Sequence, residues 1–133
     1  MRTLRTNTVL AERAEWARGL RRLVGLLTRS SLAPGEGMIF PQCRSIHTWF
    51  MRFPIDVVFL KTAEEPGTRS SWHGVVVKVV SRLEPFRIAA AGAADTTVEL
   101  PQGTVAAAGV EAGELLEIMR DNVDNNVSKR VDK

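Results

Sequence analysis

The sequence has a single cysteine and no long apolar run. One cysteine cannot form an internal disulfide, so Cys43 is expected to be a small buried side chain of a protein in a reducing compartment. No run of about 18 apolar residues is present to form a transmembrane helix. The first residues also lack the apolar segment of a signal peptide. These absences together predict a cytoplasmic protein.

The common signatures of cofactor and metal chemistry are missing as well. The sequence has no phosphate-binding loop, no dinucleotide fingerprint, no zinc-protease motif and no paired cysteines. Its two histidines, His47 and His73, are too few to predict a metal site. Cys43 and His47 would lie roughly 13 Å apart on an extended chain, which argues against covalent cysteine catalysis. No cofactor and no metal are therefore expected.

The length and composition indicate one ordinary globular domain. With 133 residues, 44% hydrophobic and 25% charged, the chain can bury a core without a disulfide or a metal. Residues 1–119 are expected to form a single domain. Residues 120–133 are polar and lack a periodic apolar pattern, so a disordered tail is predicted there.

The charge is distributed unevenly along the chain. Residues 1–52 contain nine arginines against three glutamates, whereas residues 53–133 contain nine basic against twelve acidic residues. The basic half would suit an anionic ligand or an acidic partner. Nucleic acid is not an expected partner, because the aromatic residues look like core rather than being interleaved with the basic ones.

Apolar and β-branched segments predict a mainly β fold. The expected strands cover residues 38–40, 55–60, 75–80, 96–100 and 115–119, with a strand or two within 2–13. Residues 61–74 are expected to connect two strands, and residues 84–95 to form a loop. Residues 55–60 are apolar on both faces apart from Asp56, which is typical of a central strand.

Two helical segments are predicted beside these strands. Residues 14–28 place apolar side chains on one helical face: Trp16, Leu20, Leu23, Val24 and Leu27. A short helical turn is expected over residues 104–108, with Thr104 as N-cap and Gly109 as C-cap. The predicted fold class is α+β and mainly β, a small barrel- or sandwich-like sheet with one packed amphipathic helix and a short second helical turn.

The segment from 43 to 60 is the most promising place for a site. It combines apolar residues with Arg44, Arg52 and Asp56, and buried charges require a partner. An extended chain over 45–53 would put His47, Trp49, Met51 and Phe53 on one face. Two interpretations of the charged pair stay open. Asp56 accepts backbone N–H bonds at the Pro54 bend with Arg52 screening it, or Arg52 turns outward to a ligand.

Four segments in this order resemble a known family: residues 25–32, 35–40, 46–60 and 98–104. Over about residues 8–119 the chain resembles the bacterial and archaeal family called domain of unknown function 192. The resemblance implies a compact, mainly β fold with a packed helix and implies no established activity. A protein partner connected with secretion or pili is suggested only by what is thought of some members.

Three functions are compatible with the sequence. The first is a small soluble binding or accessory module for an anionic ligand or an acidic peptide. Its site would be lined by Arg29, Arg44, His47, Arg52, Asp56 and Glu99. The second is an enzyme with His47 as general base and Asp56 as the carboxylate that orients it. The third is a protein that associates with a surface or membrane through the basic helix over 14–28.

Overall fold

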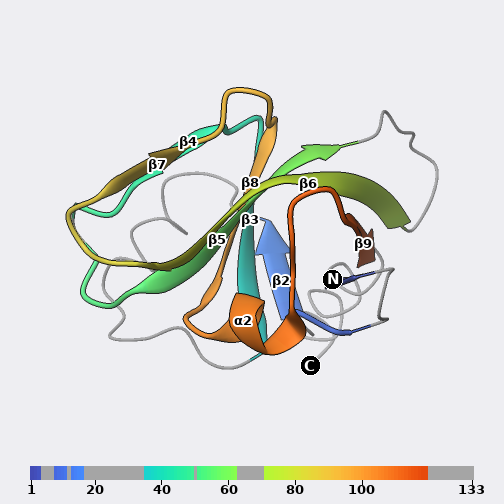
Figure 1. Cartoon of the computed structure of the whole chain (residues 1–133), viewed down its shortest axis with the longest axis horizontal. Helices are drawn as coiled ribbons and strands as arrows, with labels where there is room; N and C mark the ends of the chain where they lie inside the picture. The colour runs from blue at the N-terminus through green and yellow to red at the C-terminus, as the bar shows by residue number, and fades with distance from the viewer. Residues whose placement is uncertain (4–7, 12, 17–34, 50, 63–70, 120–133) are drawn as a thin grey trace, which may run out of the picture.

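A seven-stranded, strongly curled sheet dominates the computed structural model, which describes residues 1–3, 8–11, 13–16, 35–49, 51–62 and 71–119 (Figure 1). In spatial order its strands are β1 (Arg2–Thr3), β9 (Leu115–Met119), β6 (Ser71–Leu83), β5 (Ile55–Thr62), β8 (Thr96–Pro101), β3 (Glu36–Pro41) and β2 (Arg13–Trp16). A two-stranded ribbon of β4 (Ser45–His47) and β7 (Ile88–Ala90) stands apart from this sheet. The short helix α2 (Thr104–Ala108) follows β8. The predicted mainly β, barrel-like fold class is confirmed.

β5 is the central strand that its sequence predicts. It pairs antiparallel with β6 on one side and with β8 on the other. Ile55 to Leu60 are all buried, since both faces of the strand are covered. β6 is longer than the predicted strand over 75–80 at both ends. Residues 71–74, which were expected to belong to a connection, pair with β9, and at the other end Leu83 lies opposite Ile55 of β5.

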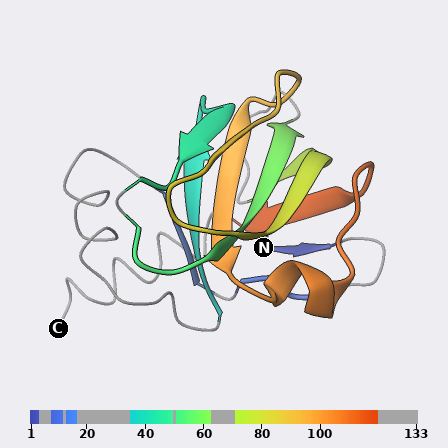
Figure 2. The same cartoon turned by 60° about the vertical axis from the view of Figure 1, so that its left-hand side comes forward.

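Side chains of β5 alternate between two cores, one on each face of the sheet. Val58 and Leu60 point to the face covered by α2, where Val105 joins the same core. Ile55, Val57 and Phe59 point to the opposite face, which the ribbon covers through Ala89. Figure 2 shows how the sheet curls between these two faces.

Helix α2 forms where predicted, but its N-terminus is capped differently. The N-cap residue is Gly103, with φ 92°, and it has no side chain to offer; the predicted Thr104 cap is wrong. Asp56 provides the missing acceptor from β5, since its Oδ2 accepts the N–H of Val105 at 2.8 Å. The predicted C-cap is confirmed, because Gly109 adopts a left-handed φ of 66° and closes the last turn.

The predicted helix over 14–28 is wrong at its start. Arg13 to Trp16 form β2, which pairs parallel with β3 and places Trp16 opposite Ile39. Pairing with a strand from elsewhere in the chain outweighs the local helical periodicity here. The rest of that prediction lies outside the described residues, as do Arg29 and the predicted tail over 120–133. No helix in the described segments is long and apolar enough to cross a bilayer.

Candidate functional site

The β4–β7 ribbon has an inner and an outer face. Ile46 lies opposite Ala89, and both pack against the core that contains Ile55, Val57 and Phe59. The next pair in the register, His47 and Ile88, points the other way, because neighbouring residues of a strand alternate. Both side chains are exposed, and Ile88 keeps 65% of its surface accessible. The ribbon therefore displays an apolar side chain and a histidine to solvent.

Thr48, at the end of the ribbon, forms hydrogen bonds with the segment that follows β6. Its hydroxyl donates to the carbonyl oxygen of Glu84 at 2.7 Å and accepts the N–H of Arg87 at 2.9 Å. Its backbone N–H donates to the carbonyl oxygen of Arg87 at 2.9 Å, and its own carbonyl oxygen accepts the N–H of Phe86 at 2.9 Å. Phe86 is thus positioned by hydrogen bonds to a buried threonine.

The prediction of an extended chain over 45–53 is wrong beyond His47. The chain turns at Thr48, and the N–H of Met51 donates back to the carbonyl oxygen of Thr48 at 3.2 Å. The turn separates side chains that were expected to share a face. Met51 is buried in the core, whereas His47 and Trp49 are exposed.

Three rings gather at the end of the ribbon where His47 pairs with Ile88. The ring centroids of His47 and Trp49 lie 6.1 Å apart in a stacked arrangement. Those of Trp49 and Phe86 lie 6.5 Å apart and tilted. Trp49 is 40% exposed and Phe86 is 63% exposed. With Ile88 these residues form what we call the ribbon patch: His47, Trp49, Phe86 and Ile88.

Phe86 is held in a backbone conformation that aromatic residues avoid. Its φ is 63°, in the left-handed region. For an L-residue this region costs roughly 1–2 kcal/mol, because Cβ approaches the carbonyl oxygen. The side chain recovers little of that cost by burial, since it is mostly exposed. A bulky apolar side chain is therefore displayed at a cost in stability, and such strain is concentrated at functional sites.

Arginines outnumber acidic residues in the segments that form the ribbon patch. The two segments that form it, residues 43–53 and 84–90, contain three arginines and one glutamate. Arg44, Arg52, Arg87 and Glu84 are all exposed. Arg87 lies directly beside the patch, because its guanidinium Nη1 donates to the carbonyl oxygen of Phe86 at 3.4 Å.

Asp56 is a structural residue in this fold. It is 1% exposed, and its carboxylate accepts the N–H of Arg82 at 2.9 Å and the N–H of Val105 at 2.8 Å. Arg52 is exposed, so of the two interpretations the one with Arg52 buried beside Asp56 at the Pro54 bend does not hold. His47 lies on the outer face of the ribbon, on the other side of the sheet from α2. The structure therefore does not bring His47 and Asp56 together as a base and its orienting carboxylate.

Glu99 is buried without a hydrogen bond to its Oε1 atom in the described structure. It lies between Val57 on β5 and Met38 on β3, both apolar. Burial among these residues raises the pKa of Glu99 to about 7, because the carboxylate is removed from water. It faces the ribbon-covered side of the sheet, opposite to the side of Asp56.

The predicted site residues that the structure describes thus lie in four separate places. His47 lies in the ribbon patch, and the exposed Arg52 belongs to the same segment of the chain. Arg44 lines a pocket beyond the other end of the ribbon. Asp56 and Glu99 are buried on opposite faces of the sheet. Among the residues that the structure describes, no group of three or more His, Cys, Asp or Glu side chains could hold a metal ion.

Sequence reasoning missed Thr48, Phe86 and Ile88. The last two lie in a segment that was expected to be a loop, where the short strand β7 forms instead. The available signal was an aromatic and an isoleucine within a stretch of otherwise polar or small residues, where neither matches a buried strand.

A curled, mostly antiparallel sheet with an exposed two-stranded ribbon and a short capped helix defines a small, mainly β module. The chain belongs to the family called domain of unknown function 192 (DUF192), described as "Uncharacterized ACR", whose model matches residues 3–118. The resemblance found in the sequence is therefore confirmed. A comparison with curated proteins gives no match.

Two solved structures share this fold. One is a Sinorhizobium meliloti 1021 protein described as a suggested transcription regulator. It has 23% identity and a TM-score of 0.61, over 78% of this chain and 80% of that chain. The other is a protein of unknown function from Novosphingobium aromaticivorans DSM 12444. It has 23% identity and a TM-score of 0.56, over 77% of this chain and 73% of that chain. At this identity the likeness shows the fold alone.

Proposed function

We propose that the protein is a binding module that docks an acidic peptide segment of a partner protein on the ribbon patch. The observation that carries this proposal is the exposed set of His47, Trp49 and Phe86, with Phe86 held at a positive φ. Aromatic side chains are enriched among the residues that dominate binding energy at protein interfaces. An apolar side chain of the peptide would lie against Trp49, Phe86 and Ile88.

The charge around the patch supports an acidic partner. Arg52 and Arg87 would meet carboxylates of the peptide, and arginine binds carboxylates through two parallel hydrogen bonds. Glu84 is the one acid in the two segments that form the patch, so a basic peptide would meet repulsion. The proposed ligand therefore combines an apolar anchor with flanking aspartate or glutamate.

Selection from a display library of random twelve-residue peptides tests this function. Against the full chain we expect the enriched peptides to contain both acidic and large apolar residues. The Trp49→Ser chain should fail to retain them. Leu115→Ser is the matched control, because Leu115 is 45% exposed but lies on β9, away from the ribbon. No enrichment, or peptides that bind the Trp49→Ser chain equally well, would contradict the proposal.

A further inference from the structure

A pocket with three charged side chains in its lining lies where β3, β5 and β8 approach the beginning of the ribbon. Its volume is about 430 Å³. The lining residues are Gln42, Cys43, Arg44, Lys61 and the turn Gly92, Ala93, Ala94 and Asp95. Two of them are cations and one is an acid. The ribbon separates this pocket from the ribbon patch, because Arg44 precedes β4 and Trp49 follows it.

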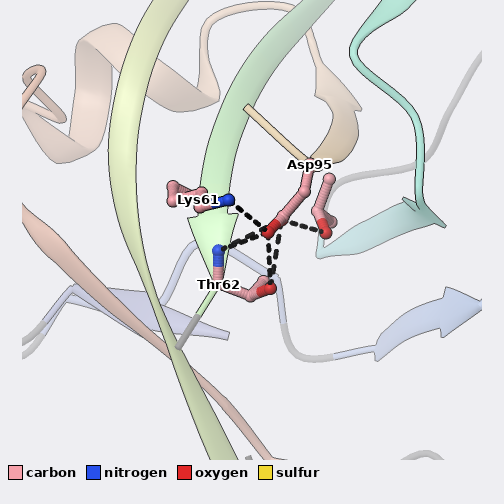
Figure 3. Close-up of polar contacts among 4 residues, drawn as sticks. Lys61, Thr62 and Asp95 are labelled. Carbon is pink, nitrogen blue, oxygen red and sulfur yellow. Dashed lines mark hydrogen bonds and ion pairs between the residues drawn. The ribbon is translucent and has the colours of Figure 1, made fainter. Parts of the chain in front are cut away.

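The acid of the pocket is already satisfied by neighbouring donors (Figure 3). Asp95 accepts the N–H of Thr62 at 3.1 Å, and the hydroxyls of Thr62 and Thr96 at 3.0 Å each. Partial burial alone would raise the pKa of Asp95, but these hydrogen bonds and the nearby Lys61 outweigh it and lower the pKa below its usual value. The negative charge of Asp95 is therefore stabilised from within the protein.

The two cations have capacity left for a ligand. The Nζ atom of Lys61 lies 3.6 Å from Asp95 Oδ2, a loose pair, and the Lys61 side chain is 63% exposed. Arg44 is exposed and has no ion pair among the described residues. Because Asp95 has its own hydrogen-bond donors, an incoming anion would compete with it only for Lys61.

The turn from Ala91 to Ala94 lines the pocket and contains two N–H groups that are not used within it. Its ends are fixed, because the N–H of Ala94 donates to the carbonyl oxygen of Ala91 at 3.0 Å and the N–H of Ala91 donates to that of Arg44 at 2.9 Å. The N–H groups of Gly92 and Ala93, between these ends, have no acceptor within the described part of the chain. Successive unoccupied N–H groups in a turn favour anion binding.

We propose that this pocket binds the phosphate group of a small molecule. Arg44 would hold two phosphate oxygens through its planar guanidinium, and Lys61 would add a second positive charge. The N–H groups of Gly92 and Ala93 would donate to the same group. This site is additional to the ribbon patch and does not depend on the function proposed for it.

Titration with inorganic phosphate, followed through the backbone amide signals in nuclear magnetic resonance, tests the site directly. We expect the amides of Gly92 and Ala93 to shift in a saturable way at constant ionic strength. Acetate, a monoanion, should bind more weakly. The Arg44→Gln and Lys61→Gln chains should each bind phosphate roughly tenfold more weakly, the loss expected for one charge-assisted hydrogen bond.

Arg82→Gln is the matched control, because it removes one exposed positive charge outside the pocket. It should leave the phosphate affinity unchanged. Absence of saturable shifts at Gly92 and Ala93 would overturn the proposal, as would equal losses in Lys61→Gln and Arg82→Gln. Peptide binding at the ribbon patch should be unaffected by Lys61→Gln, so the phosphate site and the peptide site are tested independently.

Discussion

Asp56 and Glu99 lie one position out of register on two paired strands, and their carboxylates therefore point to opposite faces of the sheet. Asp56 pairs with Leu100, and Val57 pairs with Glu99. Asp56 accepts two N–H groups on its face, whereas on the other face the Oε1 of Glu99 has no donor among the described residues. Two buried acids in neighbouring strands therefore have opposite effects on stability.

Replacing Asp56 should be strongly destabilising. Asp56→Ala leaves the N–H groups of Arg82 and Val105 without their acceptor, and unsatisfied buried donors cost roughly 1–3 kcal/mol each. We expect a loss of about 3 kcal/mol in the free energy of unfolding, measured with denaturant. Asp56→Asn keeps one acceptor oxygen, so its free energy of unfolding should lie between those of the unchanged chain and of Asp56→Ala. A loss near zero for Asp56→Ala would contradict the structural role.

Glu99 should make the protein less stable as the pH rises. Its pKa in the folded chain, about 7, lies above the ordinary value of 4.5. The folded state therefore binds the proton more tightly, and stability declines between about pH 4.5 and 7. The corresponding loss is about 3 kcal/mol, complete above pH 7.

Glu99→Gln should remove this pH dependence. The neutral side chain of similar shape should leave stability unchanged near pH 4 and raise it near pH 8. Denaturant unfolding of both chains across this range gives the comparison. Parallel pH profiles for the two chains would show that Glu99 does not titrate as described.

Thr48 should control the order of the ribbon patch. Thr48→Val keeps the shape of the side chain but removes the bonds to Glu84 and Arg87. We expect a loss of about 2 kcal/mol in unfolding free energy and faster amide hydrogen exchange at Phe86 and Arg87. Thr48→Ser keeps the hydroxyl and should preserve slow exchange. Identical exchange in all three chains would refute the role of the hydroxyl.

Phe86 should be unfavourable for stability. Asparagine tolerates the left-handed region better than phenylalanine, and little burial is lost at a side chain that is 63% exposed. Phe86→Asn should therefore unfold at an equal or higher temperature than the unchanged chain. Calorimetry measures this directly, and a clear fall in the melting temperature would mean that Phe86 contributes to the core.

The strands with strong local signals could be predicted from the sequence. The apolar segment of β5 and the valines of β6 have a composition that favours buried strands wherever they are placed. The burial of Asp56 followed from its apolar neighbours. Its hydrogen-bond partners could not be predicted in the same way, because Val105 lies 49 residues away in the sequence and only the fold brings it close to Asp56.

The ribbon and β2 show what the sequence could not predict. β7 has three residues, and its position depends on backbone bonds to Thr48 and Arg44 rather than on a periodic pattern. β2 begins a segment with helical periodicity, and its parallel pairing with β3 is a long-range contact. The segment singled out in the sequence forms one half of the ribbon patch, with His47 and Trp49; the other half, with Phe86 and Ile88, was not predicted.

The affinity of a selected acidic peptide for the Phe86→Asn chain tests the central claim most directly. Fluorescence anisotropy with the labelled peptide would compare this chain with the unchanged protein and with Leu115→Ser. If Phe86 is an anchor of the ribbon patch, its replacement should weaken binding by at least roughly tenfold without lowering the melting temperature. Leu115→Ser should bind as the unchanged protein does. Equal affinity for all three chains would show that the ribbon patch is not the binding surface.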